Sequence, residues 1–223
     1  MIVLGIETAT SLCGIGLSGD EGPIADYKLL RGTIHGEYLP IAIEHIIEGA
    51  GITISAIEGI AVSIGPGSFT GLRIGLGMAK GLAFGLSKPL IAVPTMDGLI
   101  SPIPGMCEWA CVLLIARKGE VYQGIYQWTN GCWERKDEYK IILDKKIGDD
   151  LPKADVLFLG EGSLQHQHDI QKRVKGAMFL APVHSLPSGY NIAEKGRQWL
   201  INGETADIDT LVPIYVKRFQ GIA

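Results

Sequence analysis

The sequence predicts an α/β protein of two lobes, each with a mixed β-sheet flanked by helices. In the first half, segments with strand and helix periodicity follow in the order three strands, helix, strand, helix, strand. The segment Ser101–Gly105 contains two prolines and a glycine, which predicts lobes at 1–103 and 104–223. A length of 223 residues with 47% hydrophobic content suffices for two such lobes and argues against disorder.

The first lobe opens with three apolar segments separated by short turns, which predict a meander of strands. The helix that follows begins near Glu37, because Pro40 is tolerated only near a first turn, and it ends at Gly51. A strand, a glycine-rich turn with a long helix, and a last strand complete the lobe. In chain order, the expected elements are Met1–Thr8, Leu12–Ser18, Pro23–Leu30, Glu37–Ala50, Gly59–Ile64, Gly65–Leu86 and Pro89–Val93.

The second lobe carries fewer and shorter signals. The apolar segments Trp109–Ala116 and Val121–Trp128 are joined by a short polar connection, which predicts a β-hairpin. A weaker strand is expected at Tyr139–Leu143, and a short buried strand at Val156–Gly160. Apolar residues at helical spacing predict a helix over Asn191–Ile201.

Charge and hydropathy exclude several classes of protein. The net charge of -4 gives no electrostatic basis for independent nucleic-acid binding. The longest near-apolar run, Ile74–Val93, is interrupted by Lys80, Lys88 and Pro89, so it predicts no membrane span. The N-terminal stretch lacks a basic region and carries Glu7, unlike a signal peptide, and we expect a cytoplasmic protein.

The turn GPGSFTG, residues 65–71, is a candidate phosphate-binding loop because it lies between a strand and a helix, where backbone N–H groups can point at an anion. It matches neither the dinucleotide fingerprint nor the P-loop. The favoured alternative is a strand-to-helix turn with Ser68 as the N-cap. A serine hydrolase is disfavoured, because Pro66 stands where the nucleophile elbow needs its first glycine.

The element order of the first lobe is similar to the half-unit of the actin-like ATPase and sugar-kinase (ASKHA) superfamily. In that superfamily an acidic residue at the end of the first strand helps to handle magnesium and phosphate, and Glu7 occupies this place. The residues after Glu7 lack the early glycine of a phosphate hairpin, so a structural carboxylate and a residual nucleotide role both stay open. The sequence has no H-E-x-x-H motif, and its four cysteines form no C-x-x-C pair, so buried free thiols are expected.

Three stretches carry a closer resemblance. VLGIETAT (3–10), GPGSFTGLRIGLGMAKGLA (65–83) and PIYVKR (213–218) are similar to stretches of the bacterial TsaB (YeaZ) family. The first two are specific at this spacing, and in the third Lys217 stands where the family usually has arginine. The resemblance implies a part in making threonylcarbamoyladenosine in tRNA.

The same lobe is similar to the catalytic paralogue of that family, TsaD of the glycoprotease family, which binds a metal through histidines in a segment like VHHMEGH. The matching segment here, VPTMDGL, has Pro94, Thr95 and Leu99 at the histidine positions. Leucine has no donor atom, and a neutral hydroxyl replaces imidazole poorly. The resemblance therefore implies no catalytic, metal or cofactor residues, and a subunit that binds and activates TsaD. The alternatives are an ATP-binding phosphotransferase and a metallopeptidase-like enzyme of the same fold.

The glycine-rich helix, together with the helix Glu37–Ala50, is the expected interface with TsaD. Each glycine inside a helix costs about 1 kcal/mol relative to alanine, so several of them indicate a close backbone contact. The alternative is that the glycines let the helix lie close to its own sheet. The predicted interface residues share an arc of about 120°, given 3.6 residues per turn. They are Gly71, Gly75, Met78, Gly81, Leu82 and Gly85.

The resemblance also implies the rest of the assembly. The chain is expected to bind TsaD directly, to reach the small ATPase TsaE through the complex, and to contact tRNA only indirectly. No membrane partner is expected. In the absence of TsaD, the same helix surface is expected to form a homodimer. Whether a nucleotide binds at the interface stays open.

Overall fold

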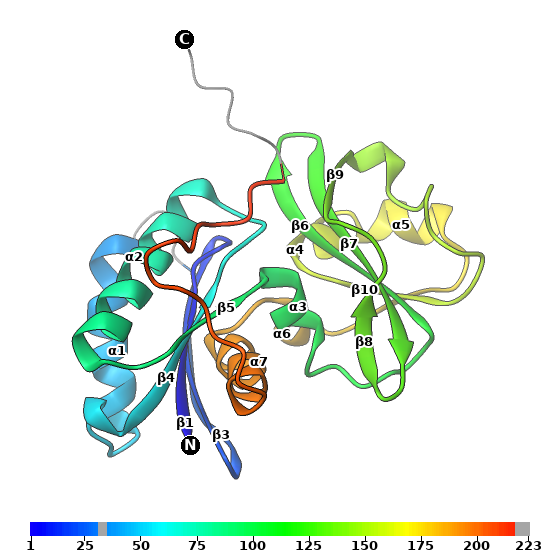
Figure 1. Ribbon diagram of the computed structural model, residues 1–223. Helices are drawn as coiled ribbons and strands as arrows, with labels where there is room; N and C mark the ends of the chain where they lie inside the picture. Colours follow the sequence, from blue (N-terminus) through cyan, green and yellow to red (C-terminus); the bar gives the residue numbers. More distant parts are fainter. Residues whose placement is uncertain (31–34, 217–223) are drawn as a thin grey trace. The chain divides into compact units, whose positions relative to one another are not determined.

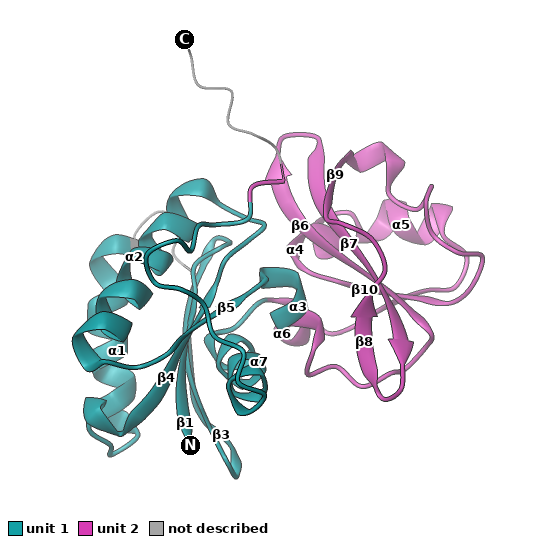
Figure 2. Ribbon diagram, viewed as in Figure 1, with its two compact units in different colours: residues 1–98, 187–214 teal, residues 99–186, 215–223 magenta. Residues whose placement is uncertain are grey.

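The computed structural model describes residues 1–30 and 35–216. The chain forms two compact units, which Figure 2 colours separately. Within the described ranges, no helix combines the length and hydrophobicity needed to cross a membrane. Unit 1 comprises residues 1–98 and 187–214, and unit 2 comprises residues 99–186 and the chain from Tyr215 onward.

Unit 1 is built on a five-stranded mixed sheet with the order β3-β2-β1-β4-β5. β1 pairs antiparallel with β2 and parallel with β4, so the apolar N-terminal strand lies at the centre of the sheet. Five of its six residues are buried, as expected of a strand covered on both faces. The strands are β1 (Ile2–Glu7), β2 (Leu12–Gly19), β3 (Gly22–Leu30), β4 (Ile57–Ser63) and β5 (Leu90–Val93).

Helices cover both faces of this sheet (Figure 1). α1 (His35–Gly49) and α2 (Phe69–Leu86) lie side by side on one face and enclose the larger apolar core with it. α7 (Gly189–Ile201) covers the other face, where Ala193 packs against Val3. The 3₁₀ helix η1 (Ile54–Ala56) follows α1, and the short helix α3 (Thr95–Ile100) follows β5.

The sequence predicts the helix α7 correctly but places it in the second lobe, whereas it packs on the first sheet. Gly196 permits this packing, because a methyl group there would overlap the side chain of Ala61. An apolar helix face fits either sheet, so the pattern alone could not decide between them. The units therefore differ from the expected lobes 1–103 and 104–223, and the first boundary follows Gly98.

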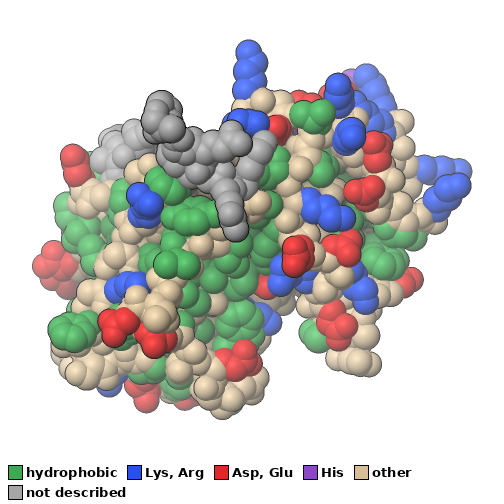
Figure 3. All heavy atoms as spheres, turned by 45° about the horizontal axis from the view of Figure 1, so that its top comes forward, with side chains coloured by type: hydrophobic (Ala, Val, Ile, Leu, Met, Phe, Trp, Pro, Cys, Tyr) green, Lys and Arg blue, Asp and Glu red, His purple; other side chains and the backbone are tan. Residues whose placement is uncertain are grey.

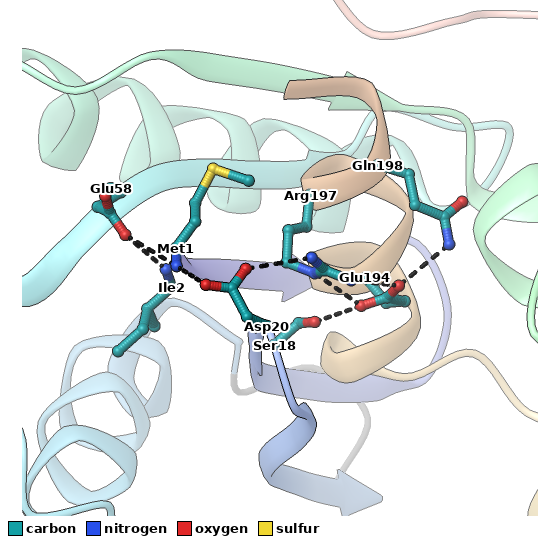
Figure 4. A network of polar contacts seen from close by, with 8 residues as sticks. All are labelled: Met1, Ile2, Ser18, Asp20, Glu58, Glu194, Arg197 and Gln198. Carbon is teal, nitrogen blue, oxygen red and sulfur yellow. Dashed lines mark hydrogen bonds and ion pairs between the residues drawn. The ribbon is translucent and has the colours of Figure 1, made fainter. Parts of the chain in front are cut away.

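A polar network fastens α7 to the sheet (Figure 4). The carboxylate of Glu194 accepts hydrogen bonds from Ser18 on β2 and from Gln198. It also pairs with Arg197, which reaches Asp20 at 3.5 Å. Burial opposes ionisation of Glu194, but the hydrogen bonds from Arg197, Ser18 and Gln198 outweigh it, so the pKa of this carboxyl lies below its usual value.

Unit 2 is built on a sheet with the order β11-β10-β6-β7-β8, and β9 also pairs with β7. The predicted hairpin is confirmed as β6 and β7, which pair antiparallel. β8, β11 and the helices α4 to α6 are missing from the prediction because each has seven residues or fewer and no resolvable periodicity. The elements are β6 (Trp109–Arg117), β7 (Glu120–Thr129), β8 (Cys132–Arg135), β9 (Lys140–Leu143), η2 (Asp144–Lys146), β10 (Val156–Leu159), α4 (Glu161–Gln165), α5 (Gln167–Arg173), β11 (Ala177–Phe179) and α6 (Pro182–Ser185).

Candidate functional site

Hydrogen bonds within the chain hold the turn between β4 and α2. The peptide bond between Gly65 and Pro66 is cis, and Gly65 has a φ of 108°. The hydroxyl of Ser68 accepts a hydrogen bond from the N–H of Gly71 at 3.2 Å, which makes Ser68 the N-cap of α2. The N–H of Ser68 donates to the carbonyl of Ala9 at 2.6 Å. The interpretation of this turn as a capped start of a helix is confirmed.

Buried polar side chains gather near the carboxyl ends of β1, β4 and β5, the edge at which open α/β sheets bind ligands. Glu7, Thr8, Ser63 and Thr95 are fully buried. The Glu7 carboxylate accepts a hydrogen bond from the N–H of Ala9 at 2.6 Å, and the Ser63 hydroxyl accepts one from the N–H of Thr8 at 3.4 Å. The first bond closes the turn after β1 and the second ties that turn to β4, so one oxygen of Glu7 stabilises the local structure.

The positions that match the metal-binding histidines of TsaD lie on α3, in the core. The hydroxyl of Thr95 accepts a hydrogen bond from the N–H of Gly65 at 3.2 Å, and the N–H of Thr95 donates to the Gly65 carbonyl at 2.9 Å. Leu99 is buried one turn later. Among the described residues, no group of three or more His, Cys, Asp and Glu side chains is placed to hold a metal ion. The hydrogen bonds of Thr95 thus stabilise the β4–α2 turn.

The C-terminal part of unit 1 packs on the same turn. The N–H of Ile214 donates to the carbonyl of Ile64 at 2.7 Å. A methyl group at Gly65 would come within 2.7 Å of the Ile214 carbonyl oxygen, so this position requires glycine for space as well as for its positive φ. The stretch PIYVKR therefore begins as a structural segment. Its residues Lys217 and Arg218 lie outside the described residues.

The first half of α2 lies against its own chain. A methyl group at Gly71 would overlap the carbonyl oxygen of Thr8, and one at Gly75 would overlap the Thr8 hydroxyl. That hydroxyl donates to the carbonyl of Gly71 at 2.8 Å. Both glycines are buried, which corrects their prediction as interface residues. At these two positions the alternative explanation, close packing within the chain, is right.

The later glycines of α2 face outward, although Ala79 and Ala83 beside them are buried in the core. Gly77, Gly81 and Gly85 are exposed, and nothing lies within 4 Å of the place where a Cβ would be. Met78 and Leu82 are neighbours of Gly81 and Gly85 at helical spacing, and they line an apolar groove of about 290 Å³ between α1 and α2. We call this groove, with Gly81 and Gly85, the α1–α2 surface. The groove is lined by Pro40, Ile43, Glu44, Ile47, Glu48, Ile54, Met78 and Leu82.

Large hydrophobic side chains are exposed on and beside these helices. Phe84 on α2 is 77% exposed, Ile41 on α1 is 47% exposed, and Ile54 in the groove is 40% exposed. Single exposed apolar residues are ordinary, whereas the apolar groove between α1 and α2 is a contiguous surface of the kind that marks an interaction site. Glu44 and Glu48 give this patch an acidic rim. Hydrophobic side chains also gather on the face of unit 1 shown in Figure 3.

The buried cysteines offer no thiolate at neutral pH. Burial, together with the nearby charge of Glu7, raises the pKa of Cys13 to about 11. Burial raises the pKa of Cys111 to about 12. A thiol with such a pKa is a poor nucleophile at pH 7. The expectation of buried thiols holds for these two, whereas Cys132 is exposed.

Two comparisons of the sequence decide the family. The model of the family described as "TsaD: tRNA N6-adenosine threonylcarbamoyltransferase" matches residues 32–188. The tRNA threonylcarbamoyladenosine biosynthesis protein TsaB of Bacillus subtilis (strain 168) is 31% identical over 237 residues, covering 100% of this chain and 97% of that protein. The chain belongs to the TsaB (YeaZ) family. This membership places it in the biosynthesis of threonylcarbamoyladenosine in tRNA.

Solved structures agree with the predicted TsaB fold. A Pseudomonas aeruginosa structure, described as an uncharacterized protein with similarity to peptidase YeaZ, matches with a TM-score of 0.81 at 25% identity and covers 97% of this chain and 99% of that chain. The ethanolamine utilization protein EutJ of Carboxydothermus hydrogenoformans matches with a TM-score of 0.53 at 15% identity, covering 86% and 89% of the two chains. With its two mixed sheets flanked by helices, the chain confirms the prediction of an actin-like, sugar-kinase-type fold.

Sequence reasoning missed parts of this site. It overlooked Thr8, because nothing in the sequence ETAT shows that the Thr8 hydroxyl contacts the glycine-rich helix about 60 residues later in the chain. It expected the helix Glu37–Ala50 at the interface as well but named no residue of it, although a signal was present. Ile43 and Ile47 recur at a spacing of four residues beside Glu44 and Glu48, the pattern of a helix face with an acidic border.

Proposed function

We propose that this TsaB-family chain is a non-catalytic subunit that binds a TsaD-type transferase through the α1–α2 surface and supports its activity. The observation that carries the proposal is the exposed half of α2. Met78 and Leu82 offer apolar contact, while Gly81 and Gly85 offer bare backbone to a close neighbour. Helix-to-helix contact at short distance is what small residues permit.

The chemistry of the surface describes the partner. The groove is apolar along its floor and acidic along α1, where Glu44 and Glu48 stand. α1 contains no lysine or arginine in its sequence HGEYLPIAIEHIIEG. A fitting partner helix therefore presents an apolar ridge with lysine or arginine beside it. Without TsaD, two copies of this chain would associate through the same apolar surface and form a weaker homodimer.

The proposal of a non-catalytic role is supported by the residues that this chain has at the histidine positions of TsaD. Thr95 and Leu99, at the histidine positions of TsaD, are core residues. The side chains of Glu7 and Ser63, near the ends of β1 and β4, accept hydrogen bonds from backbone N–H groups. We therefore propose that this chain holds no metal or cofactor. We also propose that it reaches TsaE through TsaD and functions in the cytoplasm.

The test is association with purified TsaD, measured by calorimetry. Leu82→Glu places a charge in the groove beside acidic residues and should weaken binding at least 30-fold, which corresponds to about 2 kcal/mol at an interface hot spot. Val183→Glu is the matched control, because Val183 is a 62% exposed apolar residue of unit 2. Thermal unfolding must show that both variants remain folded.

Two results would refute the proposal. Equal affinity of Leu82→Glu and the unmodified chain for TsaD would show that the α1–α2 surface is not the interface. Stoichiometric binding and hydrolysis of Mg-ATP by the chain alone would favour the competing enzyme hypothesis. We expect neither.

A further inference from the structure

The two units differ in charge as well as in fold. Among the described residues, unit 2 contains 11 Lys and Arg and 11 Asp and Glu residues, so it is formally neutral, whereas unit 1 contains 6 and 13 of them and has a formal net charge of -7. The same contrast is visible in Figure 3, where blue side chains are more frequent over unit 2 than over unit 1. The overall charge of -4 hides this division.

A groove in unit 2 gathers three of its basic side chains. It has a volume of about 730 Å³ and lies between the loop 148–155 and the turn 173–176. Lys153, Arg173 and Lys175 line it, against the one acidic residue Asp155 among the residues that line it. The groove is thus a basic concave surface on a chain that is acidic overall.

The walls of the groove are held by contacts within unit 2. The guanidinium of Arg173, at the end of α5, donates a hydrogen bond to the carbonyl of Lys145 on η2. Gly148 has a φ of 104°, and a methyl group there would press on the side chain of Val174 at 2.7 Å. These contacts therefore fix the spacing between the loop, which carries Lys153, and the turn, which carries Lys175.

The lysines at the groove are available for a ligand. Within residues 1–30 and 35–216, neither Lys153 nor Lys175 enters an ion pair, and both are exposed. Lys145, Lys146 and Lys172 stand on the adjoining η2 and α5 and are exposed as well, and they are accompanied by the exposed Asp149 and Asp150 in the loop 148–155. Several exposed ammonium groups along one groove suit a chain of phosphates better than a single small anion, because each can neutralise one phosphate.

We propose that this groove, around Lys153, Arg173 and Lys175, binds the phosphate backbone of RNA, and that the chain thereby contacts tRNA directly. The inference rests on the proposed function, which supplies tRNA as the nucleic acid present in the assembly. It revises the expectation that tRNA is contacted only indirectly. Contacts of this kind position an RNA without reading its sequence.

The test compares two charge-reversal variants that change the net charge equally. Lys153→Glu/Lys175→Glu alters the groove, and Lys118→Glu/Lys136→Glu alters two exposed lysines of the same unit that do not line it. Binding of an unmodified tRNA transcript is measured for the complex with TsaD at several salt concentrations. The groove variant should bind about tenfold more weakly, with the salt slope reduced by roughly 2, while the control changes less than about twofold.

Three results would overturn the proposal. Equal losses in both variants would show that net charge alone matters, and no loss in either would show that RNA does not use the groove. A groove variant that binds TsaD more weakly but tRNA normally would show that the groove binds an acidic protein surface. Failure of the proposed function is distinguishable, because the complex with TsaD then would not form and tRNA binding would be measured on the chain alone.

Discussion

The two halves of α2 contain the same residue type for different reasons. In the first half, Gly71 and Gly75 are buried and leave no room for a methyl group beside Thr8. In the second half, Gly81 and Gly85 are exposed and have open space around them. The helix carries the conformational cost of glycine throughout, but the fold of the isolated chain explains that cost only in the first half.

This difference teaches how to read a glycine-rich helix. A glycine that is buried against backbone is a structural requirement, and its replacement should damage folding. A glycine that lies open is a weakness in the isolated chain, and its replacement by alanine should improve stability. The second kind points to a neighbour that the chain alone does not contain, which is the basis of the proposed α1–α2 docking surface.

The largest expected effect is that of Gly71→Ala. The added methyl group would overlap the Thr8 carbonyl oxygen, which is backbone and cannot rotate away. We expect the free energy of unfolding to fall by about 3 kcal/mol, the upper range for an overpacked core. Urea unfolding measures this change. An unchanged midpoint would mean that α2 does not need to approach β1 so closely.

Gly75→Ala should have the next largest effect, about 2 kcal/mol, because the overlap is with the Thr8 side-chain hydroxyl. Removing the Thr8 hydroxyl should relieve this overlap. A double-mutant cycle with Thr8→Ala should therefore show a coupling of about 1 kcal/mol or more between the two positions. Additive effects would contradict the contact between Thr8 and the first half of α2.

Gly81→Ala and Gly85→Ala test the other half of the comparison and should each raise the free energy of unfolding by about 0.5 to 1 kcal/mol. The same substitutions should weaken the association with TsaD, because a methyl group would intrude on a close helix contact. Thermal unfolding and calorimetry are measured on the same samples. Variants that are more stable and bind TsaD equally well would remove docking as the reason for these glycines.

The smallest expected effect concerns α7, which is held by a polar network in addition to its packing on the sheet. Because hydrogen bonds from Arg197, Ser18 and Gln198 lower the pKa of Glu194 against the effect of burial, its contribution to stability is fully present above its usual pKa of 4.5 and is lost as the pH falls through the lowered value. Glu194→Gln should remove this acid dependence, with a loss below about 1 kcal/mol at pH 7. Identical acid unfolding of both proteins would contradict this role of the network.

The sequence was sufficient for most of the local structure. Alternating and helical patterns predicted the five strands of unit 1, the hairpin of unit 2 and the helices α1, α2 and α7, since each depends on the residues of its own segment. Ser68 was recognisable as an N-cap for the same reason. The short elements β8 and β11 escaped prediction because their three or four residues carry no usable period.

The candidate site was predictable only in part. Met78, Gly81, Leu82 and Gly85 were placed on one helix face by their spacing, and this face is the open one. The spacing alone could not separate them from Gly71 and Gly75, because all six residues share one arc of the helix. Only the position of β1 and Thr8 along the length of α2 divides that arc into a covered and an open part.

The sequence by itself determined the family, the order of the strands and long helices up to Val93, and the absence of histidine from residues 93–99, because these depend on residue identity and local pattern. The tertiary structure decided which sheet α7 covers, which glycines of α2 are used up inside the chain, and where the lysines of unit 2 line a groove. These depend on contacts between segments far apart in the chain. No local pattern encodes such a contact, since the same apolar face or glycine can meet several partners until the packing of the whole chain selects one.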